Sequence, residues 1–276
     1  MSVVTTPEEC RQPRTRPPRS LEVVWDPQPD EIGATVDWSR WYLTDEEDMG
    51  EGGEQEQIIW MLKQVLTQLS RERGWQDVHI GADQFFAWVE HEPLVRVSPD
   101  VYVLDHPPPR PLPPSWQTWL PGHWPPRLAF EIVSGETWRK DYHDSPEKYA
   151  QLGTRELVVF DPEAAAGRNT SAERVALQVF RREADSGFAR VYRGAGPARS
   201  DELEAWLVVL REGEAAILGV SRDAEGRDLV PTLEQARERA ELAREQERTA
   251  REQAERRLAA ALAELERIKR ERETGG

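Results

Sequence analysis

The clearest hydrophobic pattern of the chain lies in residues 127–162, where two apolar runs flank a polar stretch. Alternate positions of the first run, 128–133, would face opposite sides of a sheet, and all but one are apolar, as in a strand covered on both faces. The second run is 156–160. Between them, Pro146 favours the first turn of a helix and Gly153 favours its end. We therefore expect a strand, a short helix and a strand.

The exception within the first apolar run is Glu131. Burying a carboxylate without a partner reduces the stability of the fold by roughly several kcal/mol. The presence of Glu131 in this run therefore needs an explanation. One explanation is a function. The other is an ion pair in the core with an arginine such as Arg96 or Arg127.

A second pattern, with helical spacing, covers residues 54–73, where apolar side chains repeat along one face and Gly74 follows the last turn. Alternation and β-branched residues predict strands on both sides of the central block. These strands are expected at 77–80, 84–89, 94–97, 100–104, 175–182, 188–192, 206–210 and 215–220.

Residues 105–126 contain nine of the 21 prolines and are expected to form a long loop. The loop also carries Trp116, Trp119 and Trp124. These rings either stack on exposed bases of a nucleic acid or pin the loop onto the domain.

The pattern changes at residue 231. Residues 233–273 contain no glycine or proline, and Leu or Ala recurs at heptad-like spacing with one shift of register. This pattern predicts a long helix that associates as a coiled coil, giving a homo-oligomer through residues 231–276. The alternative is a single exposed helix held by Glu–Arg pairs four residues apart.

Composition then suggests three regions. Residues 1–20 are rich in Pro and Arg and are expected to be a disordered arm. Residues 21–230 form the main domain, and residues 231–276 the helical tail. The main domain contains 21 basic and 38 acidic residues, a net charge of −17, which disfavours sequence-independent binding to phosphate backbones.

The sequence shows neither an apolar run of membrane-spanning length nor an apolar signal core at its start. Its single cysteine, Cys10, excludes an intramolecular disulfide and fits a reducing cytoplasm. The five histidines have no paired ligand spacing, so no zinc site is expected.

Three charged residues have the types needed for phosphodiester hydrolysis. Asp100 begins a predicted strand, Glu131 lies within another, and Lys148 lies on the short helix. Two carboxylates on adjacent strands can share a Mg²⁺ ion, and a nearby ammonium can hold the attacking water and balance charge on the phosphate.

Four motifs of the chain resemble, in their order and spacing, those of the Uma-type restriction endonuclease family. They are Ser98-Pro-Asp100-Val, Phe130-Glu-Ile-Val-Ser134, Asp141 through Lys148-Tyr-Ala-Gln-Leu-Gly153 and Glu156-Leu-Val-Val-Phe-Asp-Pro162. That family belongs to the PD-(D/E)XK nuclease superfamily. The resemblance covers roughly residues 40–220 and implies an α/β fold with a mixed central sheet flanked by helices. It also implies metal-dependent cleavage of DNA, with Mg²⁺ or Mn²⁺ held by Asp100 and Glu131.

The resemblance is weakest at the lysine. The superfamily's usual position, two residues after the glutamate, is Val133, and this family's position on the helix is Ser145. Lys148, three residues further on, shares a helix face with Ser145, and Lys140 is the other candidate. Glu56 resembles a helix glutamate of the family, with the His that often follows it replaced by Gln57, although a glutamate at such a position is more often a charge on a solvated helix surface.

The sequence thus predicts a metal-dependent endonuclease. The alternative is an inactive nuclease fold that acts as an interaction module and recruits partners through its helical tail.

Overall fold

The computed structural model describes residues 53–108, 111–134, 138–169, 171–183 and 187–274. The predictions for the arm 1–20, for Cys10 and for the start of the main domain lie outside these residues. The chain divides between Val230 and Pro231 into two compact units. The first unit contains the sheets, and the second is a helix.

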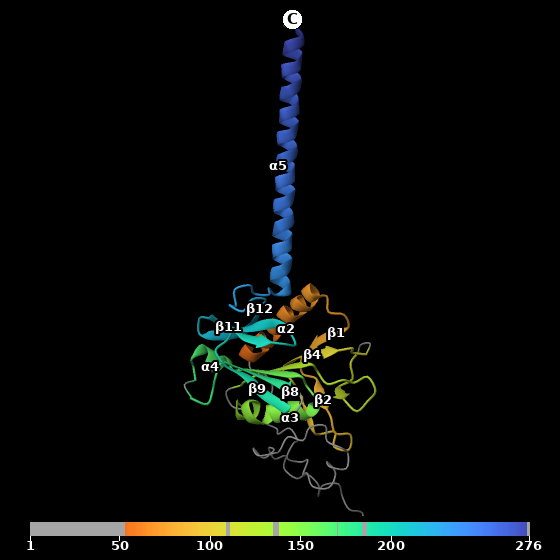
Figure 1. The fold of residues 1–276 in the computed structure, drawn as a ribbon, viewed down its shortest axis with the longest axis vertical. Helices are drawn as coiled ribbons and strands as arrows, with labels where there is room; N and C mark the ends of the chain where they lie inside the picture. Colours follow the sequence, from red (N-terminus) through yellow and green to blue (C-terminus); the bar gives the residue numbers. More distant parts are fainter. Residues whose placement is uncertain (1–52, 109–110, 135–137, 170, 184–186, 275–276) are drawn as a thin grey trace, which may run out of the picture. The chain divides into compact units, whose positions relative to one another are not determined.

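The first unit is built around a six-stranded sheet with the order β1-β4-β6-β7-β8-β9 (Figure 1). Strands β6 and β7 are parallel, and the other neighbours are antiparallel. The prediction of an α/β fold with a mixed central sheet is confirmed. The strands are β1 (Val78–Gly81), β4 (Val101–Asp105), β6 (Leu128–Ile132), β7 (Glu156–Phe160), β8 (Leu177–Glu183) and β9 (Gly187–Gly194).

The two faces of this sheet carry separate cores, which explains why β6 is apolar at nearly every position. Leu128, Phe130 and Ile132 face the helix α2 (Gly53–Arg73) and its core. Ala129 lies in the other core, together with Tyr149 and the remaining side chains beneath the helix α3 (Ser145–Leu152). Figure 1 shows α2 and α3 on opposite sides of the sheet.

The segment between β6 and β7 differs from the single short helix that the sequence predicts. A π-helical turn, η3 (Lys140–Asp144), comes first and continues directly into α3. Gly153 ends α3 with φ of 99°, in the left-handed region that glycine adopts without strain. The predicted Gly153 end is therefore confirmed, whereas the helical segment begins earlier than Pro146.

Two further sheets complete the first unit. The strands β10 (Ala198–Ser200), β11 (Ala205–Glu212) and β12 (Ala215–Ser221) form an antiparallel sheet that contacts α2 and the short helix α4 (Pro162–Ala166). The strands β2 (Phe85–Ala87), β3 (Arg96–Val97) and β5 (Ser115–Gln117) form the third.

Strand β5 corrects the prediction that residues 105–126 lack regular structure, because it pairs in parallel with β2. Its Trp116 is fully buried, donates its indole N–H to the carbonyl of Trp124 at 2.9 Å and stacks on His123. The ring of Trp116 therefore pins the loop onto the domain, while Trp124 is 61% exposed.

The second unit is the helix α5 (Leu233–Thr274), which confirms the predicted helix. The side chains and backbone N–H groups of Thr232 and Gln235 hydrogen-bond reciprocally at 3.1 and 3.2 Å, which caps the helix start. Leu242, Leu258 and Leu262 are more than half exposed. Within the described part of the chain, no helix is long and apolar enough to cross a membrane.

Candidate active site

The pairing of β4 with β6 brings Asp100 and Glu131 together. Asp100 directly precedes β4, and the register Val101↔Phe130 places it beside the carboxyl end of β6. Its Oδ2 accepts the backbone N–H of Ile132 at 2.5 Å, and its Oδ1 accepts from the side-chain amide of Gln55 at 3.2 Å. Asp100 is thus held by the strand that carries Glu131.

Glu131 is 5% exposed and accepts the hydroxyl of Tyr149 on α3 at 2.7 Å. The arginines that were alternative partners have other neighbours. Arg127 pairs with Asp105 at 3.3 Å, and the guanidinium of Arg96 lies 3.8 Å from the ring centre of Phe85. The polar surroundings of Glu131 therefore come from Asp100, from η3 and from α3.

Both carboxyls have raised pKa values. Burial raises the pKa of Glu131 to about 7, and the charge of Asp141 adds to the shift, while Lys140, Tyr149 and Lys148 oppose it. Burial also raises the pKa of Asp100 well above its usual range, and the charge of Glu131 is the next cause. Like charges in a buried site favour protonation, and a bound cation would relieve this cost.

Two lysines face this acidic group. The chain has only four lysines, Lys63, Lys140, Lys148 and Lys269, among its 36 basic residues, so two of the four lie here. Lys140, on η3, has its Nζ 3.6 Å from Oδ1 of Asp141 and lowers the pKa of both Asp100 and Glu131. Lys148, on α3, is buried and lowers the pKa of Glu131 to a smaller extent than Lys140 does.

The structure therefore brings together Asp100, Glu131 and both candidate lysines. Of the two lysines, Lys140 lowers the pKa values of the carboxyls more. Ser145, which occupies the family's lysine position, is buried at the first turn of α3.

Sequence reasoning missed two neighbours of the pair. Asp141 contributes a third carboxylate, although in the sequence only its place in the family motif marked it. Gln55, rather than the exposed Glu56, is the α2 residue that contacts Asp100. Helical spacing could have identified Gln55, because it precedes the buried Ile58 and Ile59 by three and four residues and so shares their face of the helix.

Carboxylate oxygens are the ligands that Mg²⁺ prefers, with water completing the shell, and the side chains of Asp100 and Glu131 fit this chemistry. The described residues contain no group of three or more His, Cys, Asp or Glu side chains arranged to hold a metal ion. The fit therefore rests on two carboxylates with water, and Asp141 acts here as a neighbouring charge.

A family model described as "Uma2: Putative restriction endonuclease" matches residues 43–207. The chain belongs to the Uma2 family. The matched residues contain Asp100, Glu131, both lysines and Asp141, and they end before α5. The resemblance predicted from the motifs is confirmed, and the family is one of putative restriction endonucleases.

Among solved structures, the chain is similar to a putative nuclease belonging to DUF820 from Anabaena variabilis ATCC 29413, with 12% sequence identity and a TM-score of 0.39. The similarity covers 56% of this chain and 76% of that chain. No curated protein matches the sequence.

Proposed function

We propose that this Uma2 chain is a metal-dependent endonuclease that hydrolyses phosphodiester bonds in DNA, with Mg²⁺ or Mn²⁺ held by Asp100 and Glu131. One observation carries the proposal: the buried Glu131 on β6 and the half-buried Asp100 just before β4 lie side by side with raised pKa values, and two of the four lysines lie on the adjoining η3 and α3. Membership in a family of putative restriction endonucleases supports it.

When bound, the ion would polarise the phosphate and make a coordinated water more acidic. The chain's own groups would do the rest. Asp100 is oriented by the N–H of Ile132, and Glu131 by the hydroxyl of Tyr149. An ammonium beside them would orient the attacking water and balance the charge that develops on the phosphate. Lys140 supports this role better than Lys148, because its charge acts more strongly on the acids.

The test is incubation of the purified chain with linear, nicked, branched and single-stranded DNA in Mg²⁺ or Mn²⁺. Asp100→Ala is the first control, and Lys140→Met and Lys148→Met separate the two lysines. We expect cleavage that Asp100→Ala abolishes and that Lys140→Met lowers more than Lys148→Met does. Cleavage left unchanged by Asp100→Ala would contradict the assignment.

A second candidate function is an inactive nuclease fold that serves as an interaction module. It is favoured by the net charge of −17 over residues 21–230, which repels DNA phosphates, and by the exposed leucines of α5. This module would have no need of a divalent ion, so titration of the chain with Mg²⁺ separates the two functions.

In either case we propose that residues 231–276 associate with a second copy as a coiled coil, at the positions where Leu and Ala recur at heptad-like spacing. Analytical ultracentrifugation of the full chain and of residues 1–230 tests this. A full chain that sediments as a monomer at every concentration would contradict it.

A further inference from the structure

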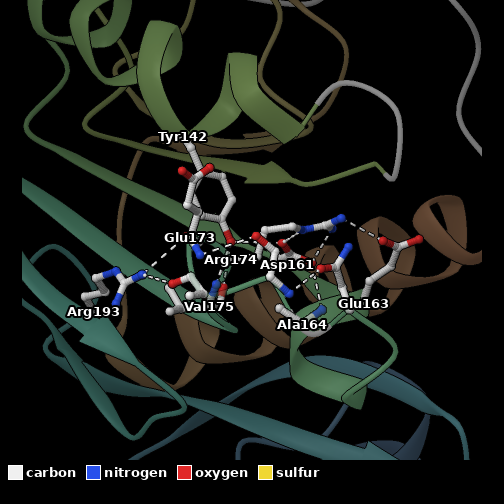
Figure 2. Close-up of polar contacts among 11 residues, drawn as sticks. Tyr142, Asp161, Glu163, Ala164, Glu173, Arg174, Val175 and Arg193 are labelled. Atoms are coloured by element: carbon white, nitrogen blue, oxygen red, sulfur yellow. Dashed lines mark hydrogen bonds and ion pairs between the residues drawn. The ribbon is translucent and has the colours of Figure 1, made fainter.

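The turn η3 presents consecutive residues to two different places. η3 continues directly into α3, whose Tyr149 donates its hydroxyl to Glu131, and on η3 the Nζ of Lys140 lies 3.6 Å from Oδ1 of the buried Asp141. The next residue, Tyr142, extends into a separate buried cluster at the end of β7 (Figure 2). π-Helical turns are rare and occur frequently at functional sites. Because Lys140 and Tyr142 lie on the same turn, contacts that fix the side chain of Tyr142 also fix the backbone position of Lys140.

The cluster around Tyr142 is extensively hydrogen-bonded. The tyrosine oxygen lies 2.9 Å from Oδ2 of Asp161 and 2.8 Å from the carbonyl of Val175, and it accepts the Val175 N–H at 2.9 Å. Asp161 is completely buried, and both its oxygens accept from the guanidinium of Arg174, at 2.7 and 2.8 Å. Arg174 also donates to Glu163 at 2.8 Å.

The support beneath this cluster is rigid. Asp161 caps α4 by accepting the N–H of Ala164 at 2.9 Å, and its own N–H donates to the carbonyl of Ala176. A bidentate pair between a buried carboxylate and a guanidinium has a fixed geometry. The hydroxyl of Tyr142 is therefore attached to a fixed point, and burial keeps it protonated by raising its pKa.

We propose that Tyr142 is a positioning residue of the active site. Through Asp161 and Arg174, it anchors the turn that carries Lys140 and Asp141 and that leads into α3 beside Glu131. The inference rests on the proposed function, because it assigns Lys140 to the reaction. It adds a dependence that neither the family nor the acidic pair implies: the presentation of the lysine is set by a cluster on the far side of η3.

The matched variants are Tyr142→Phe and, as a control, Tyr192→Phe. Tyr192 also has a hydroxyl that accepts one backbone N–H, from Gly196 at 2.7 Å, but it belongs to β9 and has no bond to η3. Both substitutions remove one oxygen and keep the ring. Thermal melts measure the loss of stability that each one causes.

The kinetic test is a double-mutant cycle with Lys140→Met. We expect Tyr142→Phe to lower kcat by about 10- to 100-fold, since small misplacements of a catalytic group have effects of this size, with KM changed less than about twofold. In the Lys140→Met background the same substitution should lower kcat by less than about twofold, because the two residues act through one group. Tyr192→Phe should change kcat by less than about twofold in both backgrounds.

Lysine acetylation provides a readout that does not require cleavage. In a limited reaction followed by mass spectrometry, Lys63 on α2 serves as the internal reference for Lys140. Tyr142→Phe should raise the rate of acetylation of Lys140, relative to that of Lys63, severalfold. Tyr192→Phe should leave this ratio unchanged. If the wild type cleaves no DNA but the ratio rises, the anchor stands and the proposed function fails.

Three results would overturn the anchor. The first is an acetylation ratio in Tyr142→Phe equal to that of the wild type. The second is a pair of effects on kcat, from Tyr142→Phe and Lys140→Met, that multiply in the double variant. Equal kinetic losses in Tyr142→Phe and Tyr192→Phe would count against it in the same way, because they would reflect stability alone.

Discussion

Glu131 and Glu156 lie in adjacent parallel strands whose ten residues are all buried, and both carboxyls have pKa values raised by burial. Their surroundings differ. The oxygens of Glu156 accept from Ser200, from the backbone N–H of Asp201 at 3.0 Å and from Arg181 at 3.1 and 3.2 Å. Glu131 accepts from Tyr149 but shares its environment with the charges of two lysines, Lys140 and Lys148, and of two further acids, Asp100 and Asp141.

This difference separates a structural carboxylate from a candidate catalytic one. The donors around Glu156 offset the cost of burying it, and they tie β7 to β10. The acids around Glu131 add repulsion that contributes nothing to folding. A chain that keeps this arrangement has a use for it, and a shared cation is the use that the residue types favour.

The largest expected effect is on catalysis. Glu131→Gln should lower DNA cleavage by about 100- to 1000-fold, equivalent to roughly 3–4 kcal/mol of transition-state stabilisation, because it removes a negatively charged ligand of the ion. Glu156→Gln should keep activity within about threefold of the wild type. Cleavage rates of the two variants, measured in saturating Mg²⁺ on the same DNA, check this contrast. Equal losses of rate in the two variants would contradict it.

The next effect is on the pH dependence of stability. The pKa of Glu131 is about 7 in the folded chain and 4.5 when unperturbed. The folded state therefore binds more protons between these values, and the free energy of unfolding falls as pH rises from about 4.5 to about 7. Glu131→Gln should remove this loss, which amounts to about 3.4 kcal/mol at most.

Urea melts across this pH interval, in the presence of a chelator, measure the effect as the difference between wild type and Glu131→Gln. The two curves should meet at the acidic end, separate between about pH 4.5 and about pH 7, and stay a constant distance apart above pH 7, with the variant more stable. Parallel curves would indicate that Glu131 titrates normally in the folded chain.

The smallest effect has the opposite sign. Glu156→Gln should destabilise the fold by about 1–2 kcal/mol at neutral pH, because an amide has one oxygen fewer to accept from Arg181, Asp201 and Ser200. Denaturant unfolding at neutral pH measures it. A Glu156→Gln variant as stable as Glu131→Gln would show that the two carboxylates are equivalent in the fold.

The sequence predicted the central sheet and the acidic pair because both depend on strong local signals. Alternation in 128–133 located β6 and made Glu131 conspicuous, and the motif order associated it with Asp100. The contrast with Glu156 could not be predicted. Glu156 is also a charge in an apolar run, and its donors Ser200 and Asp201 are more than 40 residues away.

The π-helical turn could not be predicted from the sequence either, because its Tyr142 side chain bonds to residues 19 and 33 positions away. Helical spacing therefore favoured Lys148, which shares a face with Ser145, whereas the wider turn brings Lys140 toward the acids. Strand β10 was missed because it has three residues and no apolar alternation. Tertiary contacts decided each of these features.

The most direct measurement is calorimetric titration of the full chain with Mg²⁺, and with Mn²⁺, for the wild type, Glu131→Gln and Glu156→Gln. The account predicts saturable binding by the wild type and by Glu156→Gln, and its loss in Glu131→Gln. A wild-type chain that binds neither ion, or a Glu131→Gln chain that binds as tightly as the wild type, would contradict the assignment of Asp100 and Glu131 as a metal site.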